Sequence, residues 1–134
     1  MKTKILVAAA ALLSFSTGCG VAARSPDMYR DDTKAVLEKK NDDIRACYDA
    51  VLKTTPNVGG KVTVKFTVAT DTGKISNVNV DKANTTAPEP VSSCVTKTID
   101  GLALTPADVN TGEGTWTYDF LPGSGTVTNT TIKS

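Results

Sequence analysis

Residues 61–68 read KVTVKFTV, and this stretch decides the fold of the chain. Its apolar side chains alternate with polar ones, the apolar set being Val62, Val64, Phe66 and Val68. Alternation with a period of two predicts a strand that buries one face and exposes the other. The chain must therefore supply further elements that cover one apolar sheet face.

A turn and a second strand follow this stretch. Asp71-Thr72-Gly73 suits a tight turn, because Asp and Gly tolerate the backbone conformations that such turns require. Ile75, Val78 and Val80 then form a second apolar set in which Ile75 is out of step with the other two. The sequence predicts a β-hairpin whose second strand contains a bulge.

Two segments on either side of the hairpin have a helical period. From residue 33 to 54 the apolar side chains fall close to one face, with Asp32 as a candidate N-cap. Pro56 and Gly59-Gly60 then end the helix. A second, shorter amphipathic helix is predicted from Val91 to Leu102.

The carboxyl-terminal part of the chain supplies one more strand. Gly112-Glu113-Gly114 is expected to be a turn, and Trp116, Tyr118 and Phe120 then alternate with polar residues. These three aromatic side chains are expected in the core rather than around a ligand. Residues 122–134 are predicted to be a loose Gly/Ser/Thr tail, in which residues 126–132 could add an edge strand.

The element order is α-β-β-α-β, which defines an α+β fold class. We expect a single small domain over residues 33–121, with a three-stranded antiparallel sheet and both helices on one face. About 116 residues follow the leader, enough for one domain of this size. Residues 1–18 are expected to be a lipoprotein signal peptide and residues 19–32 a flexible tether.

The amino-terminal leader predicts export and offers two processing sites. Basic residues precede the apolar run Ile5 to Leu13, and Ser16-Thr17-Gly18 leads into Cys19. This pattern resembles a bacterial lipobox and favours lipidation of Cys19, with Gly20 pointing to the outer membrane. The alternative is cleavage after Val21-Ala22-Ala23, which would release the protein into the periplasm.

The other two cysteines lie on the apolar sides of the two predicted helices. Cys47 and Cys94 could meet if these helices pack side by side, and a disulfide is the expected state in an exported protein. A redox-active or metal-binding pair is the alternative interpretation. The wide spacing and the absence of His from the sequence disfavour it.

Charge and composition exclude several classes of function. Without the leader, 13 basic side chains face 14 acidic ones, and no basic stripe indicates nucleic-acid binding. A chain with no His has no Ser-His-Asp or Cys-His arrangement. Asp42 and Asp43 are adjacent on a helix and point apart, so they form no carboxylate pair. We expect no enzyme, no catalytic residues, no cofactor and no metal.

The residues also carry a family resemblance. Ile44-Arg45-Ala46-Cys47-Tyr48 is paired with a later Cys94-Val95, and Leu104-Thr105-Pro106 follows. Over residues 34–120 the chain resembles the AgmX/PglI C-terminal domain, a family that is similar to the C-terminal domain of TonB. Such domains occur in myxobacterial envelope and gliding-motility proteins.

The resemblance implies a sheet whose first strand is central and whose outer strands, including the Trp116 strand, have free edges. An exposed edge is a template for the addition of an extended partner segment. The leading hypothesis is therefore a non-enzymatic cell-envelope lipoprotein, anchored to the membrane by its lipid, that binds an envelope protein partner. The alternative is a periplasmic binder of a small or cell-wall ligand, in a pocket against the helices or on the polar sheet face. The candidate residues on that face are Thr63, Lys65, Thr67, Asn77 and Asn79.

Overall fold

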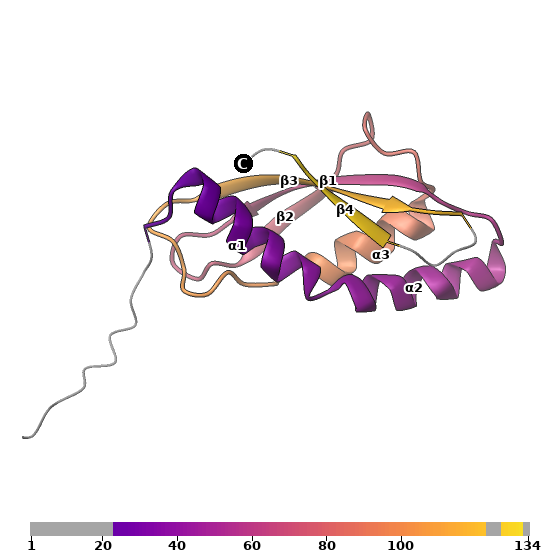
Figure 1. Ribbon diagram of the computed structural model, residues 1–134, viewed down its shortest axis with the longest axis horizontal. Coiled ribbons are helices and arrows are strands. Elements are labelled where there is room, and N and C mark those ends of the chain that lie inside the picture. The colour runs from indigo at the N-terminus through magenta and orange to yellow at the C-terminus, as the bar shows by residue number, and fades with distance from the viewer. Residues whose placement is uncertain (1–22, 123–126, 133–134) are drawn as a thin grey trace, which may run out of the picture.

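The computed structural model describes residues 23–122 and 127–132, and they form one α+β domain (Figure 1). The leader and Cys19 lie outside the described residues. The elements in chain order are α1 (Pro26–Glu38), α2 (Asn41–Thr54), β1 (Gly60–Val68), β2 (Ile75–Val80), α3 (Glu89–Ile99), β3 (Gly112–Phe120) and β4 (Val127–Ile132).

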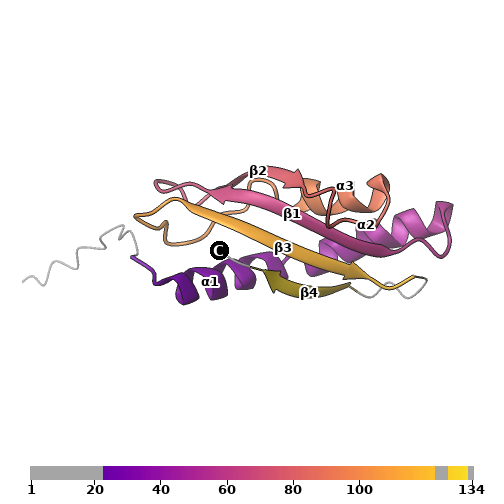
Figure 2. The ribbon, with the colours of Figure 1, turned by 90° about the horizontal axis from the view of Figure 1, so that it is seen from above.

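All neighbouring strands are antiparallel, and their order in the sheet is β2-β1-β3-β4 (Figure 2). The predicted hairpin of β1 and β2 is present, with its turn at residues 69–74. The predicted bulge is also confirmed, because the register shifts between the pairs Lys65–Asn79 and Thr67–Ser76. Asn77 within the bulge has a positive φ of 51°, a conformation that Asn tolerates better than most residues.

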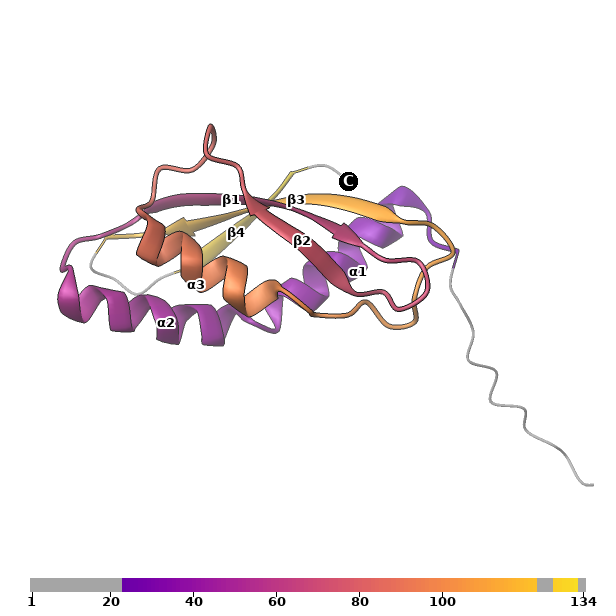
Figure 3. The ribbon, with the colours of Figure 1, turned by 180° about the vertical axis from the view of Figure 1, so that it is seen from behind.

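The apolar face of the sheet carries the core. Helices α2 and α3 lie on one side of the sheet (Figures 1 and 3), with α3 against β2 and β1 and α2 reaching β4. Trp116, Tyr118 and Phe120 on β3 are 2%, 0% and 2% exposed, so their predicted place in the core is confirmed. They pack beside the β1 valines and beneath the buried faces of the helices.

The first helical segment differs from the prediction in its start and its continuity. Helix α1 begins at Pro26, and the Ser25 side chain caps it by accepting a bond from the Met28 backbone N–H at 3.3 Å. A Ser N-cap followed by Pro at the first helical position is a strong helix start. The predicted cap at Asp32 and the predicted tether over residues 26–32 are therefore wrong, and a break at residues 39–40 separates α1 from α2.

The tail is also more ordered than predicted. Residues 127–132 form β4, which pairs along β3 from Thr115–Ile132 to Phe120–Val127. Valine, threonine and isoleucine dominate this segment, and such β-branched residues suit a strand. The Trp116 strand therefore has two neighbours and no free edge, contrary to the expectation of a three-stranded sheet with β3 outermost.

Two glycines expected in a turn lie instead inside strand β3. A side chain at Gly114 would come within 2.5 Å of the Phe66 ring, and one at Gly112 would overlap the Tyr29 ring. These glycines leave space for aromatic rings that cross the strand. Their role in the sheet is to admit these rings, which is why turn propensity alone misplaces them.

Candidate functional site

The two helices that cover the sheet are joined covalently. A disulfide links Cys47 of α2 to Cys94 of α3, with their Cα atoms 5.7 Å apart, as the sequence predicts. Cys94 is buried, and the sulfur atoms lie between two helices that pack directly on each other. In this state neither cysteine offers a free thiol to a metal or a substrate.

The outer side of β2 is covered only over its first part. Ile75 donates its backbone N–H to the Leu102 carbonyl at 2.6 Å and accepts from the Gly101 N–H at 2.9 Å. Lys74 also forms a bridge with Ala103. The segment at residues 101–103 therefore occupies this edge of the sheet up to Ile75.

Beyond the bulge the outer side of β2 is open. The Asp81 N–H donates to the Thr63 carbonyl at 2.8 Å, which fixes the pairing of the two strands at this end. Val80 lies opposite Val64 in a position where antiparallel geometry directs backbone groups away from the neighbouring strand. Within the described residues, no backbone bond outside the sheet ladder engages Val78 or Val80. This part of β2 is a free edge.

Strand β2 and helix α3 lie side by side (Figure 3). A groove lies at the end of the free edge, between β2, the loop after it and α3. Its volume is about 380 Å³. Ala87 and Ser92 are buried in its wall, whereas Lys82 and Glu89 are exposed and carry opposite charges. We call this feature the β2 groove, and its lining residues are Val80, Lys82, Thr85, Ala87, Glu89, Ser92, Ser93 and Thr96.

The polar sheet face is satisfied by its own contacts. The Thr63 and Thr117 hydroxyls are 2.8 Å apart and buried, and Thr63 also bonds to the Asn84 carbonyl in the loop above. Asp81 pairs with Lys65 at 3.0 Å. Hydrogen bonding from Asn84, together with Lys65, lowers the pKa of the Asp81 carboxyl below its usual value.

The remaining residues predicted for a ligand site on this face also bond within the sheet. Thr67 contacts both Ser76 and the Asn77 side chain, and the Asn79 side chain donates to the Asn77 carbonyl at 2.8 Å. The candidate ligand residues are thus already engaged with one another. This arrangement favours the β2 groove over the polar sheet face as a binding site.

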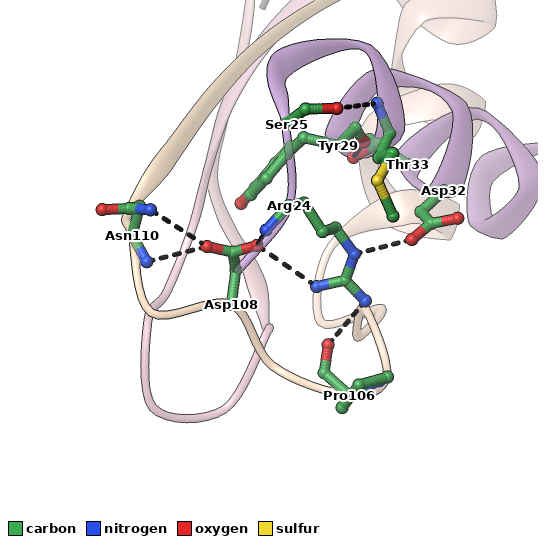
Figure 4. A network of polar contacts seen from close by, with 9 residues as sticks. Arg24, Ser25, Tyr29, Asp32, Thr33, Pro106, Asp108 and Asn110 are labelled. Carbon is green, nitrogen blue, oxygen red and sulfur yellow. Dashed lines mark hydrogen bonds and ion pairs between the residues drawn. The ribbon is translucent and has the colours of Figure 1, made fainter. Parts of the chain in front are cut away.

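A second polar cluster lies at the opposite end of the domain from the β2 groove (Figures 1 and 4). The Arg24 backbone N–H donates to Oδ2 of Asp108 at 2.9 Å, and the guanidinium reaches Asp32 at 2.6 Å and the Pro106 carbonyl at 2.8 Å. Oδ1 of Asp108 accepts from the Asn110 N–H at 2.9 Å. We call this cluster of Arg24, Asp32, Pro106, Asp108 and Asn110 the amino-terminal clasp.

The centre of the clasp is shielded from solvent, whereas Asp32, Pro106 and Asn110 at its margin are exposed. The side chains of Arg24 and Asp108 are 4% and 1% exposed, respectively. Hydrogen bonds from the Asn110 backbone and from Arg24 lower the pKa of Asp108 and hold it as a carboxylate. Burial and the nearby Asp108 charge raise the pKa of the Tyr29 phenol, which lies beside the clasp.

Sequence reasoning missed the clasp, because none of its contacts follows a period. Arg24 and Asp108 are separated by 84 positions. Two local signals were available: Arg24 directly precedes the Ser25-Pro26 helix start, and Asp108 bonds back to Asn110 as short Asp side chains often do in loops.

The remaining candidate sites show structural roles. Asp42 and Asp43 are exposed on α2, and Asp71-Thr72-Gly73 forms the hairpin turn. Among the residues that the structure describes, no three His, Cys, Asp or Glu side chains gather as they would around a metal ion. No helix in residues 23–122 has the length and apolar character needed to cross a membrane.

Comparison of the chain with protein-family models, with curated proteins and with solved structures finds no match. The resemblance to the AgmX/PglI C-terminal domain stays a prediction. The features of the domain that bear on its function are the β2 edge, the groove beside it and the two cross-links.

Proposed function

We propose that this protein is a non-enzymatic module of the bacterial cell envelope that binds an extended segment of a protein partner. The segment adds as an antiparallel or parallel fifth strand on the outer side of β2, at Val78 and Val80. The observation that carries this proposal is the free edge next to a groove of about 380 Å³. Backbone bonds along an edge supply affinity, and a groove beside it supplies selectivity for side chains.

The geometry limits the bound segment to a short one. The segment at residues 101–103 occupies the edge at Ile75, and the bulge at Asn77 separates it from the free part. A partner strand can therefore align only with the end of β2. One of its side chains would enter the β2 groove between Lys82 and Glu89, which favours a polar side chain there.

The leader and the disulfide support a compartment in the cell envelope. Disulfides persist in exported proteins and are rare in the cytosol. We propose that a lipid on Cys19 retains the module at the membrane. Binding at β2 does not require this lipid, because α1, which follows the leader, begins at the end of the domain opposite the loop between β2 and α3 (Figure 1). The partner is then another protein of the envelope.

A small ligand in the β2 groove is the second candidate function. A volume of about 380 Å³ falls within the range of small-molecule sites, and the groove contains both hydroxyl and charged side chains. Such a ligand would contact Ser92, Ser93 and Thr96 without requiring the backbone of β2. The two candidates therefore differ in whether they need the N–H of Val80.

The test is a selection of peptides on the oxidised protein followed by amide hydrogen exchange. We expect bound peptides to protect the Val78 and Val80 amides from exchange. Val80→Pro removes the N–H and should abolish binding, whereas the matched control Val80→Thr keeps the N–H and should retain it. Pro is tolerated at the outward N–H of an edge strand, so both variants should fold.

Equal binding by Val80→Pro and Val80→Thr would reject strand addition. If peptides fail to bind and a small molecule protects only the α3 amides from hydrogen exchange, the small-ligand function replaces strand addition. Circular dichroism and the retained disulfide would verify that each variant is folded.

A further inference from the structure

The amino-terminal clasp holds the chain at a single residue. The backbone nitrogen of Arg24 and all three nitrogens of its guanidinium contact the clasp, and the side chain is 4% exposed. Ser25 then caps α1 and Pro26 begins it. Among the described residues, the clasp therefore attaches the amino-terminal end of α1 to the rest of the domain through Arg24.

The surroundings of the Arg24 nitrogen suit a charged amino group. The nitrogen is 2.9 Å from a carboxylate oxygen of Asp108, whose side chain is 1% exposed. A cavity of about 310 Å³ lies beside both residues. Tyr29 also lines this cavity.

A free α-ammonium at Arg24 would use these features better than an amide does. It carries two more protons than the amide N–H and a full positive charge. The charge would strengthen the contact with Asp108, because hydrogen bonds between two ionised groups are stronger than those from a neutral donor. The additional protons would face the cavity beside Arg24 and Asp108.

The Ala23–Arg24 bond has an accessible residue on its amino side. Ala23 is exposed, in contrast to the Arg24 side chain that follows it. Val21 and Ala23 are small residues at the third and first positions before the bond, as signal-type cleavage sites require. Cutting this bond leaves every contact of the clasp in place.

We propose that the Ala23–Arg24 bond is a processing site and that Asp108 is the acceptor for the amino terminus it creates. An envelope peptidase hydrolyses the amide with one water, leaving a carboxylate on Ala23 and an ammonium on Arg24. The product is a soluble form of the module, released from any anchor at Cys19. This inference does not depend on strand addition at β2.

The in-cell test uses the full chain expressed in a bacterium, with intact masses taken from the soluble and membrane fractions of the envelope. We expect a soluble species that starts at Arg24. Ala23→Trp should abolish it by placing a bulky residue next to the bond, whereas the matched control Ala22→Trp should not. If no species starts at Arg24, the processing site is rejected, and the β2 proposal is unaffected.

The physical test compares three purified chains that end at Ser134. One starts at Arg24 with a free amine, one is the same chain N-acetylated, and one begins two residues earlier at Ala22. We expect the free-amine chain to unfold with an equilibrium constant about tenfold smaller than the other two, the scale of one charge-assisted bond. Acetylation keeps the N–H and removes the charge, so it isolates the ammonium.

Asp108→Asn should make the three chains equal, because it removes the charge that the ammonium meets. Equal stability of the three chains with Asp108 intact would overturn the role of Asp108. If the Asp108→Asn variant does not fold, the acetylated chain still decides the question.

Discussion

The disulfide and the amino-terminal clasp each join distant parts of the chain, but by different physics. The disulfide closes a loop between residues 47 positions apart and acts mainly by restricting the unfolded chain. The clasp joins residues 84 positions apart through hydrogen bonds and charge, and acts only in the folded state. The disulfide is thus a covalent restraint on the unfolded chain, whereas the clasp is a set of polar contacts that depends on the geometry of the folded chain.

Removing the disulfide should have the largest effect on stability. Cys47→Ser together with Cys94→Ser should lower the free energy of unfolding by about 4 kcal/mol, the entropy of closing a loop of this length. Urea unfolding of the oxidised wild type and the double variant measures the difference. A loss below about 1 kcal/mol would mean that helix packing alone already restricts the chain, and that the disulfide adds little.

Removing the Arg24 side chain from the clasp should have a smaller effect on stability. Arg24→Met keeps much of the side-chain volume and should cost about 1 kcal/mol through lost hydrogen bonds. The same substitution in the cysteine double variant tests whether the clasp and the disulfide stabilise the domain independently. Independence is expected because the two cross-links share no residue. Their effects should add within about 0.5 kcal/mol, and a larger coupling would contradict the view of two separate restraints.

The acid response should show the smallest effect. Asp81 and Asp108 both have a lowered pKa, and the Asp108→Asn variant isolates the contribution of the clasp. The pKa of Asp108 is lowered in the folded state, so its stabilisation is present above the unfolded value near 3.9. It is lost as the pH falls through the lower folded pKa. The stability difference between the wild type and Asp108→Asn should therefore shrink below about pH 4.

Urea unfolding at several pH values between 7 and 2 measures this response. The disulfide contributes no titrating group, so the difference between oxidised and reduced wild type should change little over the same range. A constant difference between the wild type and Asp108→Asn across this range would contradict the ionised state assigned to Asp108.

The comparison also shows what sequence reasoning can reach. The hairpin, the bulge at Asn77 and the buried aromatic strand follow from periods that each segment carries within itself. The disulfide follows because Cys47 and Cys94 lie on the apolar faces of two such segments. Features that follow from local periodicity and residue type are predictable.

Features that depend on the geometry of distant backbone segments cannot be predicted from the sequence in this way. The clasp requires the loop at residues 105–111 to bring Asp108 to Arg24. No sequence pattern predicts the conformation of that loop. Gly112 was misplaced because its role depends on the Tyr29 ring from another element. In the candidate site, the free edge of β2 is what the family resemblance implies, whereas the groove beside it depends on where α3 packs.

Strand β4 has a consequence for the order in which the domain can be completed. A chain that emerges amino end first presents Cys47 and Cys94 well before residues 127–132 arrive. The covalent link can thus close while β3 still has only β1 as a neighbour. Strand β3 therefore keeps one open edge until β4 pairs with it, and residues 127–132 complete the sheet last.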